Sequence, residues 1–281
     1  MVAPDRERLK RAFGKAGREA PPAAQGEGVG EVRRFLQRRR AERPVVELPE
    51  GEVVTNPQGS CWRRLLRYPM DHRHGSLRVG DASKVDWSSV AALAREEQFA
   101  EQELGECLFV DTETTGLGGG AGTVVFVIGM GWFESDAFVL EQLFLRNFAE
   151  EPACLQHMAE RLAVHPVPVS FVGKSFDRHR IAARLAVHAM KAPILTQRHL
   201  DLYYLARRAW RDELENHRLR TVEEQRLGVF RRDDLPGSEA PVAFMDWIRD
   251  GTGPVDRVLE HNRIDVLSLA TLLARLGAAA T

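Results

Sequence analysis

The chain has 281 residues, of which 44% are hydrophobic and 28% are charged, and its formal net charge is −1. This composition can supply a sizeable core, and the balanced charge excludes a uniformly basic surface, so contacts with DNA or RNA must come from local patches. The chain contains no run of 18 apolar residues, and its charged start lacks the apolar region of a signal peptide. Its three cysteines are not paired in sequence, which is typical of a reducing compartment; we therefore expect a cytoplasmic protein with no membrane contact.

The first hundred or so residues are expected to precede the core. Residues 1–30 are rich in Ala, Gly, Pro and charge, which predicts a disordered basic tail. Residues 31–103 are expected to form a lead-in segment packed on the core, with a basic helix, two apolar pieces near 52–54 and 62–68, and a helix near 88–102. The basic residues of this N-terminal region are compatible with a solvated tail or with a nucleic-acid-binding patch.

The core domain is expected over residues 104–278. The predicted elements are strands over 107–114, 123–133, 137–145 and 167–172, helices over 151–164, 176–190 and 254–276, and a strand or strand–helix over 199–211. Three strands with short links, followed by alternating strands and helices, predict an α/β fold in which a mixed β-sheet is flanked by α-helices.

Asp111 and Glu113 stand one residue apart at the end of the first predicted core strand. Side chains alternate along a strand, so both carboxylates are expected on one face. Two like charges at the edge of an apolar core are unfavourable unless a cation lies between them. Mg²⁺ and Mn²⁺ prefer such oxygen ligands. The alternative is a strand end with two solvated acids.

Further polar residues occur at two later elements. Asp177 begins a predicted helix after a short apolar strand, where it is either a helix-capping acid or a ligand. His261 and Asp265 are four residues apart on the C-terminal helix, so they share a face, as an exposed ion pair would also do. Asn262 falls within the apolar stripe of that helix, and we expect it to be hydrogen-bonded to backbone near the Asp111 strand.

Together, four carboxylates and a histidine are the set that two-metal phosphoryl transfer requires. A histidine with an ordinary pKa near ~6.5 can take a proton from water at neutral pH. No cysteine lies within the three motifs, which favours oxygen-ligated ions over zinc. The expected cofactors are therefore two divalent metal ions, Mg²⁺ or Mn²⁺.

The ordered motifs resemble those of RNase H-like 3′–5′ exonucleases with the Asp-Glu-Asp-Asp signature, and in particular the bacterial YprB-type branch. The residues that carry the resemblance are Gly59–Trp62, Asp71–Gly75, Asp111–Leu117, Gly173–Asp177, Asp234–Ser238 and His261–Asp265. The resemblance implies an RNase H-like fold and a metal-dependent exonuclease that acts on nucleic acid, with DNA favoured over RNA. It also implies a setting in DNA repair and a helicase partner.

The resemblance further implies individual roles. Asp111 would bridge both metal ions, Glu113 and Asp265 would complete the site of one ion, and Asp177 would hold the other. His261 would be the general base, although three residues separate it from Asp265, whereas four do so in the best-known histidine-containing members. Substrate contacts are expected at Thr114, Thr115, Leu117, Lys174, Arg178 and Asn262.

Two other functions fit the same residues. The chain could be a catalytically silent module that binds nucleic acid or a helicase, because a fold does not prove activity. It could also be a structure-specific endonuclease, which would cut closed circular DNA, whereas an exonuclease cannot start there.

Overall fold

The computed structural model describes residues 45–116 and 122–278, which belong to one structural unit beginning at Val45. The tail expected over residues 1–30, the basic helix of the lead-in segment and Leu117 lie outside the described residues. No helix in the described ranges is both long and apolar enough to cross a bilayer.

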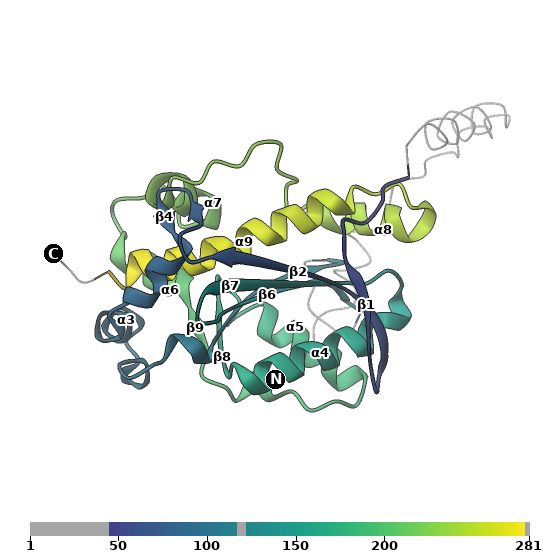
Figure 1. The fold of residues 1–281 in the computed structure, drawn as a ribbon, viewed down its shortest axis with the longest axis horizontal. Coiled ribbons are helices and arrows are strands. Elements are labelled where there is room, and N and C mark those ends of the chain that lie inside the picture. Colours follow the sequence, from purple (N-terminus) through teal and green to yellow (C-terminus); the bar gives the residue numbers. More distant parts are fainter. Residues whose placement is uncertain (1–44, 117–121, 279–281) are drawn as a thin grey trace, which may run out of the picture. The chain divides into compact units, whose positions relative to one another are not determined.

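A seven-stranded mixed sheet forms the centre of this unit, with the strand order β1-β2-β7-β6-β5-β8-β9 (Figure 1). The strands are β1 (Glu52–Asn56), β2 (Gly59–Pro69), β5 (Cys107–Thr114), β6 (Val125–Phe133), β7 (Ala137–Phe144), β8 (Val167–Ser170) and β9 (Leu200–Asp201). Pairing is antiparallel from β1 to β5 and parallel from β5 to β9. Therefore β5, which carries Asp111 and Glu113, joins the antiparallel and parallel parts of the sheet.

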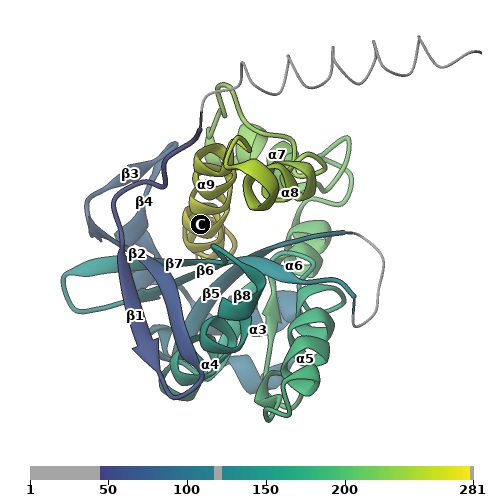
Figure 2. The same cartoon turned by 90° about the vertical axis from the view of Figure 1, so that its right-hand side faces the viewer.

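Helices cover both faces of the sheet. The α-helices are α3 (Trp87–Ala94), α4 (Glu151–Val164), α5 (Asp177–Val187), α6 (Leu202–Ala209), α7 (Leu219–Val222), α8 (Ala240–Asp250) and α9 (Val255–Leu276). Shorter elements are β3 (Arg73–His74), β4 (Leu77–Arg78), η1 (Val79–Lys84), η2 (Glu97–Phe99), η3 (Leu104–Glu106), η4 (Phe148–Glu150), η5 (Pro193–Leu195) and η6 (Glu223–Leu227). Helices α4 and α5 lie on one side of the sheet, and α8 and α9 lie on the other (Figures 1 and 2).

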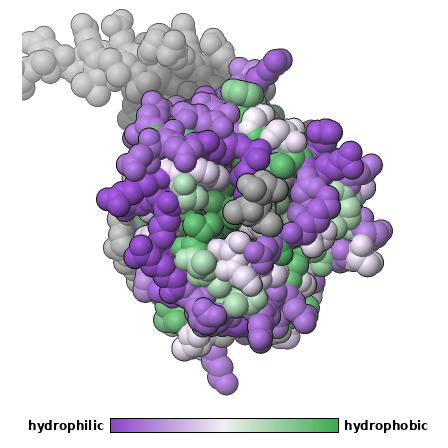
Figure 3. Space-filling model, turned by 90° about the vertical axis from the view of Figure 1, so that its left-hand side faces the viewer, coloured by the Kyte–Doolittle hydropathy of each residue, from purple (hydrophilic) through white to green (hydrophobic). Residues whose placement is uncertain are grey.

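The burial pattern explains this layered arrangement. Every residue of β6 and β7 is buried, as expected for strands covered on both faces. The apolar stripe of α9, which includes Val258, Val266 and Leu273, packs on the sheet and is itself buried. The surface seen in Figure 3 is mostly hydrophilic, with hydrophobic side chains gathered near its centre. The predicted α/β fold, a mixed sheet flanked by helices, is confirmed.

Several predicted elements differ in extent from the observed ones. The helix expected near 88–102 ends at Ala94, because Arg95 adopts a left-handed conformation with φ 59°. The strand expected over 167–172 ends at Ser170, and the segment 199–211 contains the short strand β9 followed by α6. Strands β1 and β2, which fall within the lead-in segment, pair through β2 with β7 and so extend the central sheet.

Candidate active site

Asp111 is held from the side of α9 by Asn262. The Asn262 Nδ2 group donates to Asp111 Oδ2 at 2.8 Å and to the Asp111 carbonyl oxygen at 3.1 Å. Asn262 Oδ1 in turn accepts a hydrogen bond of 2.9 Å from Gln142 Nε2. The predicted hydrogen bond to the Asp111 strand is therefore confirmed. Asn262 is 0% exposed, so the expectation that it contacts substrate is wrong: it supports Asp111 from within the core.

A glycine allows α9 to approach the sheet at this point. Gly129 on β6 pairs with Asp111, and a Cβ atom at Gly129 would lie 2.3 Å from Asn262 Oδ1. Such a contact is far shorter than atoms tolerate, so any side chain would push Asn262 away. The sequence shows Gly129 only as an interruption of an apolar strand.

Asp177 begins α5 and is reached from the other face of β5. Thr112, which alternates with Asp111 and Glu113, donates from Oγ1 to Asp177 Oδ1 at 2.9 Å. In the preceding turn, Gly173 leaves space for the carboxylate, since a Cβ there would lie 3.1 Å from Asp177 Oδ2. Thus the strand that carries two of the predicted ligands also orients a third.

The turn before Asp177 is fixed by Asp201, which sequence reasoning did not identify. The Asp201 carboxylate accepts hydrogen bonds from the backbone N–H groups of Val172 at 2.8 Å and Lys174 at 3.0 Å. Val172 has φ 66°, a strained conformation for a β-branched residue that needs such support. Asp201 could have been noticed only as the capping residue of α6, where it accepts from the Tyr203 N–H.

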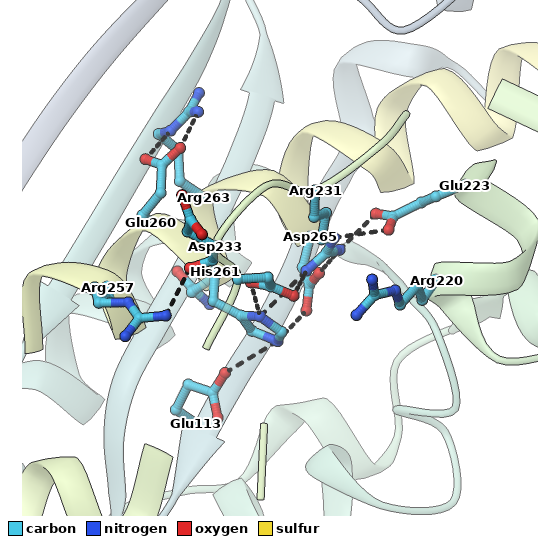
Figure 4. Close-up of polar contacts among 12 residues, drawn as sticks. Glu113, Arg220, Glu223, Arg231, Asp233, Arg257, Glu260, His261, Arg263 and Asp265 are labelled. Carbon is cyan, nitrogen blue, oxygen red and sulfur yellow. Dashed lines mark hydrogen bonds and ion pairs between the residues drawn. The ribbon is translucent and has the colours of Figure 1, made fainter. Parts of the chain in front are cut away.

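His261 lies between two groups of carboxylates (Figure 4). Its Nδ1 is 2.7 Å from Asp234 Oδ1, while its Nε2 is 3.5 Å from Asp265 Oδ2 and 3.9 Å from Glu113 Oε1. Burial lowers the pKa of His261, but the charge of Asp265, the hydrogen bond to Asp234 and the charge of Glu113 outweigh it, and the net pKa is raised. The ring is therefore anchored at one nitrogen and presents the other to the site.

Arg231 is a second residue that the sequence did not reveal. Its guanidinium, with a side chain only 3% exposed, bonds to Asp265 and to both oxygens of Glu223, and it lies 3.2 Å from His261 Nδ1 (Figure 4). Glu223 also accepts from Ser268 Oγ, which contacts His74 Nε2 at 2.8 Å. In sequence, Arg231 stands in a charged loop that resembles a solvent-exposed segment, so only its burial identifies it.

The remaining predicted contacts are distributed around these groups. Thr114 and Thr115 shape the end of β5, because Thr114 Oγ1 donates to the Gly116 carbonyl and Thr115 Oγ1 accepts from the Val124 N–H. Lys174 Nζ is 2.7 Å from Glu96 Oε1, so its charge is engaged by the lead-in segment. Arg178 is half-buried next to Asp177.

The carboxylates around β5 carry unfavourable charge. Burial, followed by repulsion from Asp265, Glu113 and Asp177, raises the pKa of Asp111 well above its usual range. Burial is also the main cause that raises the pKa of Glu113 to about 8 and that of Asp177 to about 6. Such a set of oxygen donors suits hard divalent cations, which would relieve this repulsion.

The ligands are not gathered as a finished metal site, however. Among residues 45–116 and 122–278, no three His, Cys, Asp or Glu side chains surround one point closely enough to hold an ion. Asp265 is instead engaged by Arg231. A hollow of about 220 Å³ opens beside these groups, lined by Leu219, Arg220, Arg231, Asp234, Pro236, Gly237, His261 and Asp265.

The sequence and fold are similar to those of known proteins. A model of the RNase H superfamily matches residues 108–277, and the chain belongs to this superfamily. It is similar to the uncharacterized protein YprB of Bacillus subtilis (strain 168), with 32% identity over 221 residues, which are 77% of this chain and 53% of that protein. The chain thus spans about half the length of this relative, and the predicted resemblance to YprB-type RNase H-like proteins is confirmed.

The solved structures with similarity to this chain include the family B DNA polymerase of the hyperthermophilic archaeon Pyrobaculum calidifontis. It is 16% identical, with a TM-score of 0.44 over 62% of this chain and 27% of the polymerase chain. RNase H-like proteins generally hydrolyse nucleic acids and generally use divalent metal ions.

Proposed function

We propose that the chain is a metal-dependent 3′–5′ exonuclease that hydrolyses phosphodiester bonds of nucleic acid, with DNA as the favoured substrate. The observation that carries the proposal is the meeting of Asp111 and Glu113 on β5 with His261 and Asp265 on α9. Burying several like charges together destabilises the folded chain, and a purely structural role does not explain such an arrangement. The DNA-repair setting and the helicase partner rest on the resemblance alone.

Each residue has a separate task in this proposal. Asp111, Glu113, Asp177 and Asp265 would hold two divalent ions, which activate the attacking water and stabilise the leaving oxygen when bound. His261 would take the proton of that water at Nε2, because Asp234 occupies Nδ1 and fixes the ring orientation. Arg220, which lines the site hollow and points toward Asp265 in Figure 4, would contact a substrate phosphate.

A silent nucleic-acid-binding module is the second candidate, and one observation favours it. Arg231 neutralises Asp265, and in an inactive protein this ion pair could replace a metal ion permanently. In an exonuclease, the same arginine would have to share Asp265 with the metal. Metal dependence of substrate turnover separates the two candidates.

The test uses purified protein with 3′- and 5′-labelled single-stranded and duplex DNA and RNA. Mg²⁺, Mn²⁺ and EDTA are compared, and Asp111→Ala is measured alongside. We expect metal-dependent shortening from the 3′ end, reduced about 10³-fold or more in the variant, since a metal ligand contributes several kcal/mol to the transition state.

Other outcomes would change the conclusion. Cleavage of closed circular DNA would indicate an endonuclease, which needs no free end. Binding of oligonucleotides that is unaffected by EDTA, with no cleavage of any substrate by folded protein, would favour the silent module.

A further inference from the structure

A basic and aromatic surface follows α6 away from the candidate active site. One hollow of about 700 Å³ is lined by Phe171, Val172, Tyr203, Arg207, His217, Arg218 and Leu219. A second hollow of about 250 Å³ is lined by Arg95, Tyr204, Arg207, Arg208 and Arg211. Among the residues lining these two hollows, all of them in the described part of the chain, none is acidic. We refer to the two hollows together as the α6 groove.

The α6 groove adjoins the candidate active site. Leu219 lines both the site hollow and the first hollow of the groove, and Arg207 lines both hollows of the groove. A second connection is made by Tyr204, whose hydroxyl is 2.9 Å from Ser175 Oγ in the turn that precedes Asp177. The hollows therefore lie next to one another, in the order site hollow, first hollow and second hollow of the groove.

The arginines of the groove keep their charge available. Arg207 and Arg211 are exposed, and among the described residues neither forms an ion pair with a carboxylate. The nearby acids are mostly engaged elsewhere: Glu96 pairs with Lys174, and Glu213 pairs with Arg226. Asp212 and Glu215 are nearby negative charges that remain. The groove thus has the local positive charge that the net charge of −1 does not provide to the chain as a whole.

Aromatic rings stand between these arginines. Phe171 and Tyr203 contact edge to face with centroids 5.6 Å apart, and Tyr203 contacts Tyr204 in the same way at 5.3 Å. All three rings are half-buried, so each has a supported edge and a part open to solvent. Rings held in this way lose little conformational entropy when a planar group stacks on them.

We propose that the α6 groove binds single-stranded nucleic acid on the side of the scissile bond away from the 3′ terminus. Exposed arginines interleaved with aromatic rings suit phosphates and unstacked bases, whereas a duplex hides the faces of its bases. An acidic peptide would use the arginines but not the rings. This proposal extends the proposed function and rests on it for the direction in which the bound strand runs. Binding of the strand in the α6 groove does not require catalysis.

The experiment measures binding by the full chain in EDTA, so that no turnover is required. Fluorescent oligo-dT of about 12 nucleotides is compared with oligo-dT of about three nucleotides, which is too short to extend into the groove. Binding by the wild-type protein is compared with that by Arg207→Glu/Arg211→Glu and Tyr203→Ala. The matched control is Arg73→Glu/Arg78→Glu, which makes the same charge change on the β3–β4 hairpin, away from the lining of either hollow. Circular dichroism confirms that each variant is folded.

We expect the wild type to bind the longer oligonucleotide at least about tenfold more tightly, and the arginine double variant to lose this advantage. The slope of log affinity against log salt should fall by about 1.4 with two phosphate contacts removed. Tyr203→Ala should weaken binding by about fivefold or more, and the control should match the wild type.

Three results would overturn the proposal: no length dependence in the wild type, an equal loss in the control, or competition by polyglutamate as strong as that by oligo-dT. The two proposals can fail separately. Length-dependent binding without cleavage would contradict the exonuclease proposal and support the α6-groove proposal. Cleavage by the wild type, with unchanged binding in the arginine double variant, would support the exonuclease proposal and contradict the α6-groove proposal.

Discussion

The candidate active site has two parts in which carboxylate charge is compensated differently. The helix side consists of α9 and the loop that carries Arg231, and the sheet side consists of β5. On the helix side, Arg231 pairs with the acids Glu223, Asp234 and Asp265, so this cluster contains a cation of the protein itself. On the sheet side, Asp111 and Glu113 are half-buried near each other, and their pKa values are raised mainly by desolvation. The difference is that the helix side carries its own partner cation, whereas among the described residues no Lys or Arg pairs with Asp111 or Glu113, which suits the proposed metal ions.

The largest expected effect comes from removing the internal cation. Arg231→Met leaves Glu223 and Asp265 buried without their partner, so the free energy of unfolding should fall by about 3–5 kcal/mol. Urea denaturation measures this loss. Adding Glu223→Gln should recover part of the loss, because it removes one unpaired charge. Arg249→Met, which removes an exposed arginine from its pair with Asp246, should have a much smaller effect on stability. Equal effects of the two arginine variants would contradict the comparison.

A smaller effect is expected where the helix approaches the sheet. Gly129→Ala would place a methyl group against Asn262, so we expect a loss of about 1–3 kcal/mol in unfolding free energy from overpacking. Nuclease activity should fall with it, because Asn262 holds Asp111. Gly105→Ala is the control, since a Cβ there meets no atom within 4 Å. Activity that persists in Gly129→Ala would show that Asp111 does not need this support.

The protonation of His261 offers a finer test of how the two sides interact. A general base must be neutral, so the rate should rise with pH through the raised pKa of His261. The Asp265 charge and the hydrogen bond that His261 donates to Asp234 both raise this pKa, against the opposing effect of burial. Asp234→Asn removes one of these contributions, and the acid limb of the single-turnover pH profile should move to lower pH. A shift to higher pH would exclude His261 as the base.

The last expected effect is the pH dependence of stability in metal-free protein. The pKa of Glu113 is about 8 in the folded chain and 4.5 ordinarily, so the folded state binds more protons between these values. Stability should therefore fall as pH rises from about 4.5 to 8. Glu113→Gln removes this loss, and its melting temperature should exceed that of the wild type more at pH 8 than near about pH 5. The exposed Glu101→Gln, measured in parallel, should show no such trend.

Much of the fold follows from periodic patterns that the sequence displays directly. The apolar run before Asp111 and the apolar stripe around Asn262 correctly located β5 and α9, because burial of those residues fixes both elements. The hydrogen bond between the two elements was also predicted, since a polar group in an apolar stripe needs a partner.

The supporting residues could not be predicted in the same way. Arg231 and Asp234 lie in a loop whose position depends on tertiary contacts, and a charged loop has no periodicity that would indicate burial. Lys174 was expected beside Asp177 because it is close in sequence, but Glu96, 78 residues away, engages its side chain. Pairing between distant segments decides such contacts, and a single sequence does not record it.

The division of the site between β5 and α9 also has a consequence for the timing of folding during synthesis. Asp111, Glu113 and Asp177 leave the ribosome well before His261 and Asp265, and chains grow at about 5–20 residues per second. For several seconds, the growing chain contains the acidic strand without the helix that supplies Asn262 and the arginine-bound aspartate. In the proposed exonuclease, a newly made chain would therefore have no complete cleavage site until α9 docks, and nearby nucleic acid would be protected until then.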